Sequence, residues 1–408
     1  MRSMFGRFWG SLRDLPQAMQ LSAVMSGLVV VLVSFTGPIL IIIQAGQNAG
    51  LSNSALYSWI WAVTFASGLT SLLLSLLYRQ PIITAWSSAG AALLVTSLAQ
   101  YGLQQAIGAY IIAAIAVTLV GFTRLFGRAM ALVPQPIALG MLAGVLLRFG
   151  IGLFHVLPER PLMVILMLLV FIGLRRVGFR APTIGALLIG LGVAGVQGDV
   201  DLSQLQLGLS LPQVTMPLFT PGAALGLALP LFILTMTSQN APGFAVLRNS
   251  GYNTPIDGPI ALTGLASLAI APLGGSGVNL AAITAAICTG PEAHPDPNRR
   301  YAAGVATGIG YMIAASLAAT AVSFFSGFPP ALSAAVAGLA LSGAIGSSLA
   351  GALGDTHTRD AALVAMLVTA SEISFFGVGA PFWGLIFGMA VHLGLSYTRK
   401  QRSSALEE

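Results

Sequence analysis

Neutral hydrogen-bonding residues mark two irregular places in a chain that is otherwise strongly apolar. Ser87 and Ser88 follow the extended-looking run PIITAW at 81–86 and open a stretch of small, helix-forming residues. Asn279 follows a glycine-rich run at 274–277 and precedes the short helix-forming stretch 280–289. The free N–H groups and the dipole at the start of a helix favour an anion. Two such starts aimed at one point would bind a carboxylate, and the same geometry would let Ser87 and Ser88 serve only as helix caps.

Other polar residues near the ends of apolar segments extend this candidate site. Gln239 and Asn240 are candidates for substrate binding, and a hydrogen bond between helices is the alternative role. Gln44 is a deeper candidate than Gln47, which would lie at the outer mouth. Trp86 offers a face for an aromatic ring, although packing or interfacial anchoring is its simpler role. The predicted substrate-binding residues are Ser87, Ser88, Gln239, Asn240, Asn279, Gln44, Gln47 and Trp86.

Arg148 and Glu372 are the two charged residues that lie deep within apolar segments. An ionisable residue inside a membrane is a functional hypothesis by default. Both lie past the middle of segments that run in the same direction, so we expect them to form an ion pair. Glu372 is also the leading candidate for proton coupling, because it is the acid best placed to change its charge during transport.

The composition excludes several other functions. Apolar residues make up 56% of the 408 residues and charged residues only 7%, which is typical of a membrane protein that crosses the bilayer many times. The four histidines are scattered without ligand spacing and there is one cysteine, so we expect no metal, no cofactor and no disulfide. No nucleophile and base are clustered, which argues against an enzyme. The basic residues lie between apolar segments, which argues against nucleic acid as a partner.

The pattern predicts an all-α polytopic protein with fourteen transmembrane segments. A membrane-spanning helix needs roughly 20 apolar residues. The segments are predicted at 21–44, 54–78, 81–99, 107–126, 136–154, 161–174 and 182–196, and at 222–244, 260–272, 274–289, 302–325, 330–353, 361–376 and 381–397. The third and the tenth look like an extended piece followed by a half-helix. Unpaired backbone in a membrane is tolerated only inside protein or along a cavity, so these breaks mark the binding site.

The basic residues predict the orientation of the chain. If the N-terminus is cytoplasmic, nearly all short loops with arginine fall on the cytoplasmic side, as the positive-inside rule requires. Both termini are then cytoplasmic. Residues 1–20 carry three arginines among Phe5, Phe8, Trp9 and Leu12, which indicates an interfacial amphipathic helix.

Short motifs recur in order in the two halves of the chain, which indicates an internal repeat. Gln47-Asn48-Ala49 recurs as Gln239-Asn240-Ala241, Ser87-Ser88 corresponds to Asn279-Leu280, and Ala181-Pro182 corresponds to Ala380-Pro381. Because each half has an odd number of segments, the second half enters from the opposite side, which is typical of secondary transporters. We expect an interfacial segment at 1–20, repeats at 21–196 and 221–397, a linker at 197–220 and a cytoplasmic tail at 398–408.

The run from Asn279 to Tyr301, together with Thr369-Ala-Ser and Pro381-Phe-Trp-Gly384, resembles the benzoate:proton symporter family of bacterial inner membranes. More distantly, the layout is similar to nucleobase permeases and to sulfate and bicarbonate carriers, which share a seven-plus-seven inverted repeat. The resemblance implies a core domain at 21–126 plus 221–325 and a gate domain at 134–196 plus 329–397. It also implies short strands before both half-helices, with the substrate between them and the eighth segment. Gln239 takes the place of a substrate-binding carboxylate of nucleobase permeases, and this chain has no acid or histidine on that segment.

These features predict a secondary transporter that imports benzoate or a related aromatic carboxylate together with a proton. An uncoupled anion channel or exchanger and a nucleobase-type permease on the same scaffold stay open as alternatives. The partners implied are the carboxylate, the proton and the lipid bilayer. The sequence does not fix the oligomeric state, and a homodimer stays open.

Overall fold

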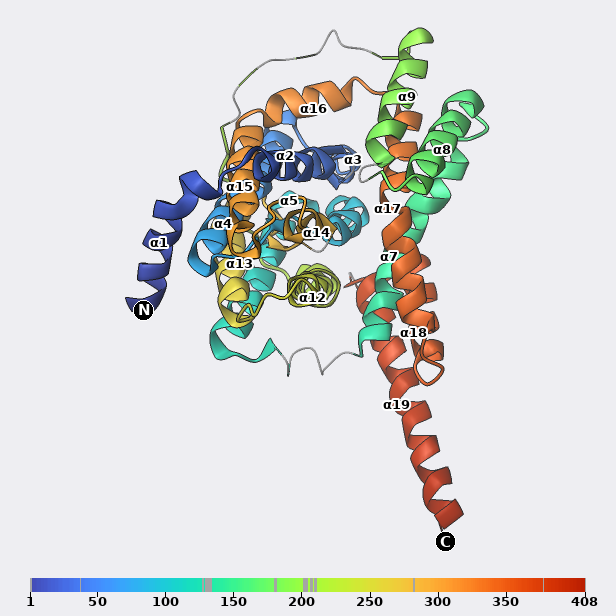
Figure 1. The fold of residues 1–408 in the computed structure, drawn as a ribbon. Helices are drawn as coiled ribbons and strands as arrows, with labels where there is room; N and C mark the ends of the chain where they lie inside the picture. Colours follow the sequence, from blue (N-terminus) through green and yellow to red (C-terminus); the bar gives the residue numbers. More distant parts are fainter. Residues whose placement is uncertain are drawn as a thin grey trace.

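The structure is a computed structural model that describes the chain except for residues 1, 37, 127, 129–133, 180–181, 201–204, 206–207, 209–210, 282, 377 and 408. The described chain is mostly helical and forms two bundles beside each other, with helix α1 (Arg2–Ala18) on the outside of one of them (Figure 1). Several helices have a proline in their first turn, where its missing N–H costs no hydrogen bond. Proline therefore sets many of the helix boundaries.

We call the first group of helices the core bundle. It contains α2 (Leu21–Thr36), α3 (Pro38–Asn48), α4 (Asn53–Tyr78), β1 (Thr84–Ala85) and α5 (Ser88–Thr123) from the first half of the chain. From the second half it contains α10 (Pro221–Ala223), η1 (Ala224–Ala228), α11 (Leu229–Leu234), η2 (Thr235–Asn240), α12 (Ala241–Asn249), α13 (Asp257–Ile270), η3 (Ala271–Leu273), β2 (Asn279–Leu280), α14 (Ile283–Thr289), η4 (Pro297–Arg299), α15 (Tyr301–Ser316) and α16 (Ala318–Ser326).

The second group, which we call the gate bundle, stands as a row of long helices at the other side of the molecule (Figure 1). It contains α7 (Gln135–His155), α8 (Pro161–Arg176), α9 (Pro182–Val196), α17 (Pro330–Leu353), α18 (Arg359–Ala370), β3 (Ser374–Phe375), β4 (Val378–Gly379) and α19 (Ala380–Glu407). The bundle names follow the domains expected from the sequence, and their roles as core and gate stay a prediction.

Helices from the two halves of the chain pack on one another. In the core bundle α4 packs on α15 and α5 packs on α13, and in the gate bundle α7 packs on α17 and α18. The contact of α4 with α15 depends on small residues, because a Cβ on Gly68 would lie 2.6 Å from the Gly308 carbonyl oxygen. Close approach through small residues is a common way to pack helices in a membrane. An internal repeat would produce this arrangement, in which helices of the first half of the chain pack on helices of the second half.

Six helices of the described chain are long and apolar enough to cross a membrane by length and composition, or seven if α15 and α16, bent by 68°, count as one. Shorter apolar helices lie at Pro182–Val196, Asp257–Leu273 and Ala380–Leu395. The number of times that the chain crosses the membrane, fourteen in the sequence analysis, therefore stays a prediction. One predicted helix was too long: residues 361–376 are helical only to Ala370, and an antiparallel hairpin of β3 and β4 follows.

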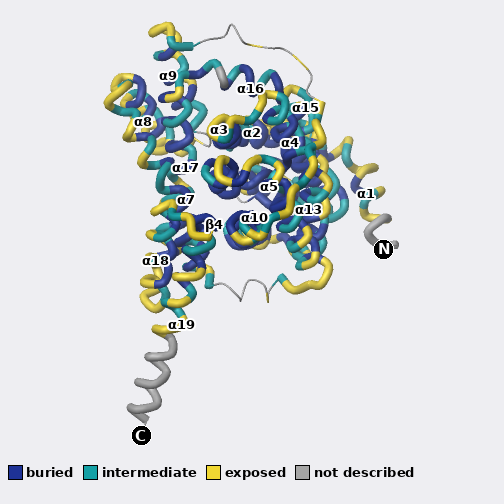
Figure 2. Tube along the Cα trace, turned by 180° about the vertical axis from the view of Figure 1, so that it is seen from behind, coloured by how far each residue is buried: buried dark blue, intermediate teal, exposed yellow. Residues whose placement is uncertain are grey.

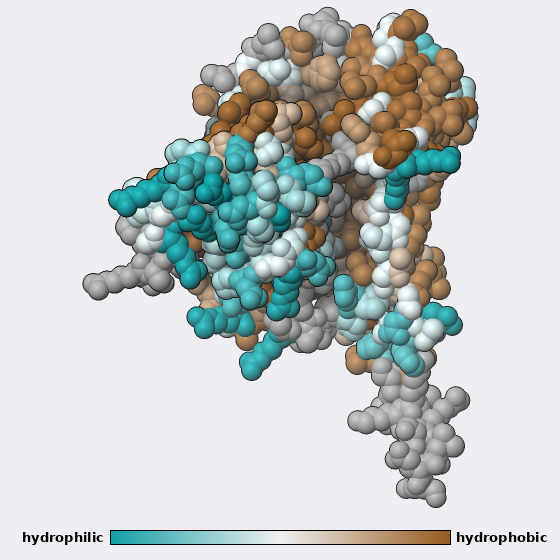
Figure 3. Space-filling model, viewed as in Figure 1, coloured by the Kyte–Doolittle hydropathy of each residue, from teal (hydrophilic) through white to brown (hydrophobic). Residues whose placement is uncertain are grey.

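Buried residues lie inside both bundles and between them, and the exposed residues lie on the outside (Figure 2). The outer surface of α8 and α9 is strongly apolar, with Leu169, Leu188 and Val196 exposed (Figure 3). Hydrophilic side chains gather instead on the α1 side of the molecule in this view. An apolar outer surface of this kind suits contact with lipid hydrocarbon.

Candidate functional site

Two short strands from opposite halves of the chain meet inside the core bundle. β1 and β2 pair antiparallel, with Thr84 opposite Leu280 and Ala85 opposite Asn279. Each strand leads into a helix: α5 begins at Ser88 and α14 begins at Ile283. The structure thus has an extended piece before a helix at both places expected from the sequence. The pairing brings the start of α5 close to Asn279.

Hydroxyl groups of α4 hold β1 in place. The Thr84 hydroxyl lies 2.6 Å from that of Thr70 and 2.9 Å from that of Ser71, and it donates to the Ser67 carbonyl oxygen at 2.9 Å. The Ser71 hydroxyl in turn accepts the N–H of Thr84 at 2.9 Å. These side chains are buried. Because unpaired polar groups are costly when buried, the network fixes the position of β1 within the bundle.

Side chains of the second half hold β2 in the same way. The Asn240 Oδ1 accepts the N–H of Leu280 at 2.9 Å, and the Ser267 hydroxyl accepts the N–H of Val278 at 2.8 Å. Asn240 is fully buried and lies in η2, a π-helical turn within the segment from α10 to α12. Turns of this type are frequent at functional sites. The sequence predicts substrate binding for Asn240, with a hydrogen bond between helices as the alternative. In the structure its Oδ1 contacts the backbone of β2 and so helps to position the crossing.

The start of α5 is a capped half-helix. The Ser87 side chain accepts the N–H of Gly90 at 2.8 Å, so this hydroxyl serves as the helix cap. Ser88 is the first helical residue, half-buried, and its hydroxyl has no hydrogen-bond partner within the described chain. The helix breaks again at Gly102, where φ is 74°. The first half of α5 is thus a separate half-helix whose start is open to a ligand contact through Ser88.

Asn279 lies in β2, several residues before α14 begins, and not at the helix start where the sequence placed it. Its side chain is only 2% exposed, and its Oδ1 has no hydrogen-bond partner in the described chain. An amide can present either its oxygen or its NH₂ group to a partner. Asn279 is therefore a buried polar group at the crossing with unused hydrogen-bonding capacity.

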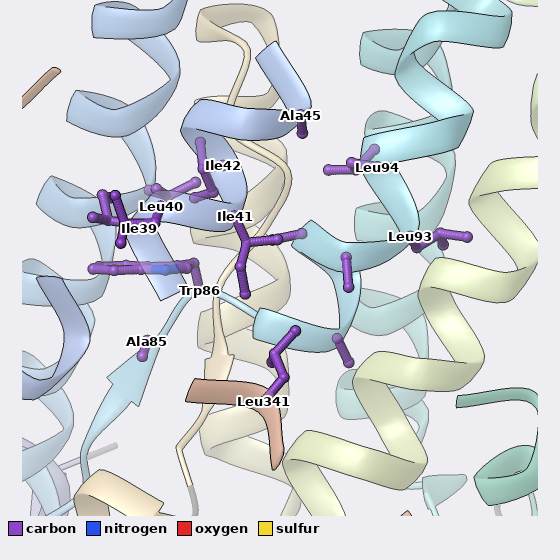
Figure 4. Packing of buried hydrophobic residues seen from close by; sticks show 14 of the residues in the cluster. Ile39, Leu40, Ile41, Ile42, Ala45, Ala85, Trp86, Leu93, Leu94 and Leu341 are labelled. Carbon is purple, nitrogen blue, oxygen red and sulfur yellow. The ribbon is translucent and has the colours of Figure 1, made fainter. Parts of the chain in front are cut away.

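The Trp86 ring packs against two other rings. Its centroid lies 5.8 Å from that of Phe35 in an edge arrangement and 5.7 Å from that of Tyr311. Figure 4 shows the ring beside Ile39 and Leu40 of α3, on the side away from Leu93. The ring therefore forms part of the buried core. Its N–H has no acceptor within the described residues, so the polar edge alone is left for a ligand.

The glutamines lie around this centre. Gln239 is half-buried in η2 beside Asn240. In α3, Gln44 is half-buried and Gln47 is exposed, so Gln44 is the deeper of the two, as expected. No hydrogen bond holds any of these three side chains within the described chain, which leaves their amides available.

Arg148 connects the two bundles. Its Nη1 lies 3.3 Å from the Glu372 Oε1, which confirms the predicted ion pair, and its Nη2 donates to the Ala92 carbonyl oxygen at 2.9 Å. Arg148 and Glu372 belong to the gate bundle, whereas Ala92 lies on the half-helix of α5. Sequence reasoning missed this second contact. It places a cation of the gate bundle against the half-helix that begins at Ser88.

The sequence also missed the hydroxyl network around Thr84. The signal was present, because Ser67, Thr70 and Ser71 lie at helical spacing on one face of α4. Within the described residues there is no group of three His, Cys, Asp or Glu that could hold a metal ion.

The chain is similar in sequence to known membrane transport proteins. Residues 17–393 match the protein family described as benzoate membrane transport protein. The chain is 41% identical over 381 residues to the benzoate membrane transport protein of Acinetobacter baylyi, covering 93% of this chain and 97% of that one. It is also 41% identical over 372 residues to the inner membrane protein YdcO of Escherichia coli, covering 91% and 95%.

Solved structures with a similar fold are anion transporters. The fold is similar to that of SLC26A9 with a TM-score of 0.64 at 13% identity, covering 95% of this chain and 67% of that one. It is also similar to the transmembrane domain of the cyanobacterial bicarbonate transporter BicA, with a TM-score of 0.60 at 14% identity, covering 90% and 96%. At these identities the likeness establishes the fold and nothing about the substrate.

Proposed function

Because the chain belongs to the benzoate membrane transport protein family, and is therefore a transporter and not an enzyme, we propose that it imports benzoate or a related aromatic carboxylate across the bacterial inner membrane. The observation that carries this proposal is the crossing of β1 and β2, which brings the open start of α5 next to a buried, unpaired Asn279. A helix start supplies free N–H groups and a favourable dipole for an anion.

In the proposed complex the carboxylate lies at the start of α5. The Ser88 hydroxyl donates to it, and the Asn279 amide turns its NH₂ towards it. Gln239 and Gln44 supply further neutral donors at the edge of the site. A neutral site of this kind suits a carboxylate better than a nucleobase, because ring N–H groups would be left without the acid that they need at position 239.

We also propose that a proton accompanies the carboxylate. Protonation of Glu372 would neutralise one partner of Arg148, and the guanidinium would then be held only by the Ala92 carbonyl oxygen of the half-helix. The contact between the gate and core bundles would thus respond to the proton. Protonation of the bound carboxylate is the alternative route, because Asn279 can accept the O–H of a carboxylic acid as readily as it donates to a carboxylate.

The proposed arrangement in the membrane is a seven-plus-seven inverted repeat with both termini in the cytoplasm. The positions of the arginines and the packing of first-half on second-half helices support it. The core and gate bundles are then the moving and the static parts of the transporter. The homodimer stays a prediction, which light scattering of the solubilised protein would test.

An uncoupled anion channel or exchanger is the second candidate, since the fold is shared with anion transporters. Uptake of radiolabelled benzoate into proteoliposomes under an imposed pH gradient separates the two. A coupled importer accumulates benzoate above equilibrium, and a protonophore abolishes the accumulation. Equilibration without accumulation would assign the protein to the uncoupled class.

The same assay tests Glu372. We expect Glu372→Gln to reduce pH-driven accumulation several-fold while benzoate binding by the purified protein changes much less. The reason is that the amide cannot release or take up a proton, whereas it still fills the space beside Arg148. Accumulation at the wild-type rate would show that Glu372 has a structural role and that the proton follows another route.

Substitutions of Asn279 test the binding site. Asn279→Asp places a negative charge beside the carboxylate, and we expect it to abolish benzoate binding in a titration of the purified protein. Asn279→Ala removes one neutral contact, so we expect a weakening of about tenfold, which corresponds to about 1.4 kcal/mol. Equal effects of the two substitutions would mean that Asn279 does not face the ligand.

A further inference from the structure

A second polar site lies between α1 and the body of the core bundle. It is a cavity of about 690 Å³ lined by Gly6, Arg7 and Gly10 of α1, by Tyr78, Arg79 and Gln80 at the end of α4, by Gly251, Tyr252 and Asn253 after α12, and by Asn298 of η4. None of the residues proposed to bind the carboxylate belongs to this lining. The cavity is therefore separate from the crossing of β1 and β2.

The charged residues of the lining are both arginines. The Arg79 Nη2 lies 2.6 Å from the Asp14 Oδ2, and its guanidinium lies over the Tyr301 ring at 5.5 Å from the centroid. Arg7 has no carboxylate partner within the described part of the chain, and its side chain is exposed. Asp296, which caps η4, lies 3.5 Å from the Arg299 Nε. The positive charge of Arg7 is thus left for a ligand.

Neutral donors complete the lining. The Gln80 Oε1 accepts a hydrogen bond from the Thr254 hydroxyl, which leaves the Gln80 NH₂ group for another partner. Asn253 and Asn298 are exposed amides at the same cavity. Tyr252 has a structural role, because its hydroxyl donates to the Pro297 carbonyl oxygen at 3.0 Å. Burial raises the pKa of the Tyr252 hydroxyl, so it keeps its proton and this bond at neutral pH.

Helix α1 places the cavity at the depth of lipid headgroups. Phe8 and Leu15 pack on the hydrophobic core, while Trp9 and Leu12 are 49% and 39% exposed. The Tyr301 hydroxyl donates to the Ser11 carbonyl oxygen at 2.8 Å and fixes the helix to α15. A helix with exposed Trp and Leu lies in the boundary between headgroups and acyl chains. Gly6 and Gly10, one turn apart, add no side chain to its cavity side, so Arg7 is the α1 side chain that lines the cavity.

We propose that this cavity binds the phosphate group of an anionic phospholipid from the leaflet in which α1 lies, with Arg7 as its main counter-charge. The amides of Gln80, Asn253 and Asn298 donate to the phosphate oxygens, and Gly6 and Gly10 leave room for the glycerol backbone. Arginine is well suited to this contact because its planar group can donate two hydrogen bonds to one phosphate. A free phosphate ion has the same chemistry and is the competing source.

The test uses the full chain purified in detergent and titrated with phosphatidylglycerol, phosphatidylcholine or inorganic phosphate, with bound lipid counted by native mass spectrometry. We expect phosphatidylglycerol to be retained in preference to phosphatidylcholine. Arg7→Gln should weaken this retention about fivefold, the effect of one arginine close to an anionic lipid. Arg13→Gln, which removes an exposed arginine of α1 outside the cavity, should weaken it much less.

Gly10→Leu fills the cavity without changing the charge. A Cβ at Gly10 meets no other atom within 4 Å, so the variant should fold and should lose the lipid. Equal losses for Arg7→Gln and Arg13→Gln, or full retention by Gly10→Leu, would overturn the site in favour of general attraction between a basic surface and acidic lipid. Competition by millimolar inorganic phosphate for all of the bound phosphatidylglycerol would assign the cavity to the free ion and overturn the lipid source.

Discussion

The two strand pairs of this protein differ in almost every respect except their length. β1 and β2 come from opposite halves of the chain and are buried, whereas β3 and β4 form a local hairpin at 374–379. Around β1 and β2, hydroxyl and amide side chains bind the strand backbone. At the hairpin, Phe375 and Phe376 are exposed, and Glu372 and Phe376 have φ values of 54° and 53°.

The hairpin touches the core bundle through hydrogen bonds and through the packing of Gly379 on Gly226 of η1. The Gln100 Nε2 donates to the Ser374 hydroxyl at 3.0 Å, and the Gly379 N–H donates to the Tyr101 hydroxyl at 3.2 Å. A buried pair held by side-chain hydrogen bonds moves as one body, whereas a hairpin with one exposed strand and two residues at positive φ beside it can change its contacts at lower cost. The difference indicates that the crossing is the more rigid region and that the hairpin is the more pliable contact between the two bundles.

The largest effect is expected when the hydroxyl network of β1 is broken. Thr84→Val removes a buried hydroxyl that makes three contacts, with the hydroxyls of Thr70 and Ser71 and with the Ser67 carbonyl oxygen. We expect a loss of about 3 kcal/mol in stability, seen as a large drop in the thermal unfolding midpoint in detergent. Thr84→Ser, which keeps the hydroxyl, is the control. A Thr84→Val protein as stable as wild type would mean that the crossing is not held by these contacts.

A smaller effect separates the neighbours Asn240 and Gln239. Asn240→Ala leaves the N–H of Leu280 without its acceptor, and we expect a loss of about 2 kcal/mol in stability. Gln239→Ala breaks no such contact, so we expect stability within about 0.5 kcal/mol of wild type together with weaker benzoate binding. Thermal unfolding and a binding titration of both variants provide the measurement. If Gln239→Ala lowers the stability as much as Asn240→Ala does, the assignment of a structural role to Asn240 and a binding role to Gln239 is wrong.

The smallest effect is expected in the hairpin. Phe376→Gly removes the strain of a left-handed conformation, which stabilises the folded state by about 1–2 kcal/mol. Glycine also makes the unfolded chain more flexible, which destabilises the folded state by about 0.5–1 kcal/mol. The two changes nearly cancel, and Phe376 is 91% exposed, so we expect an unfolding midpoint close to that of wild type. If the unfolding midpoint falls as far as it does in Thr84→Val, the hairpin is not the more pliable of the two strand pairs.

Local sequence signals located the main features of the site. The glycines and β-branched residues before Ser87 and Asn279 interrupt the helix pattern, and both interruptions are where the strands lie. Arg148 and Glu372 were predicted to pair because a membrane interior offers a charged group so few partners. The family, too, could be identified from the run 279–301, because its residues form a specific motif.

Only the tertiary structure decided what each polar group does, because the partner of a hydrogen bond can come from anywhere in the chain. Asn240 and Gln239 are neighbours of the same chemical class, yet only Asn240 meets the strand N–H of Leu280. Trp86 packs against Phe35 and Tyr311, which are far from it in sequence. The apolar residues of the hairpin at 374–379 continue the apolar pattern of the preceding helix. The sequence pattern therefore does not distinguish these two strands from the end of a helix. The Arg148 guanidinium donates to the Ala92 carbonyl oxygen, and only the packing of the two bundles brings these two groups together.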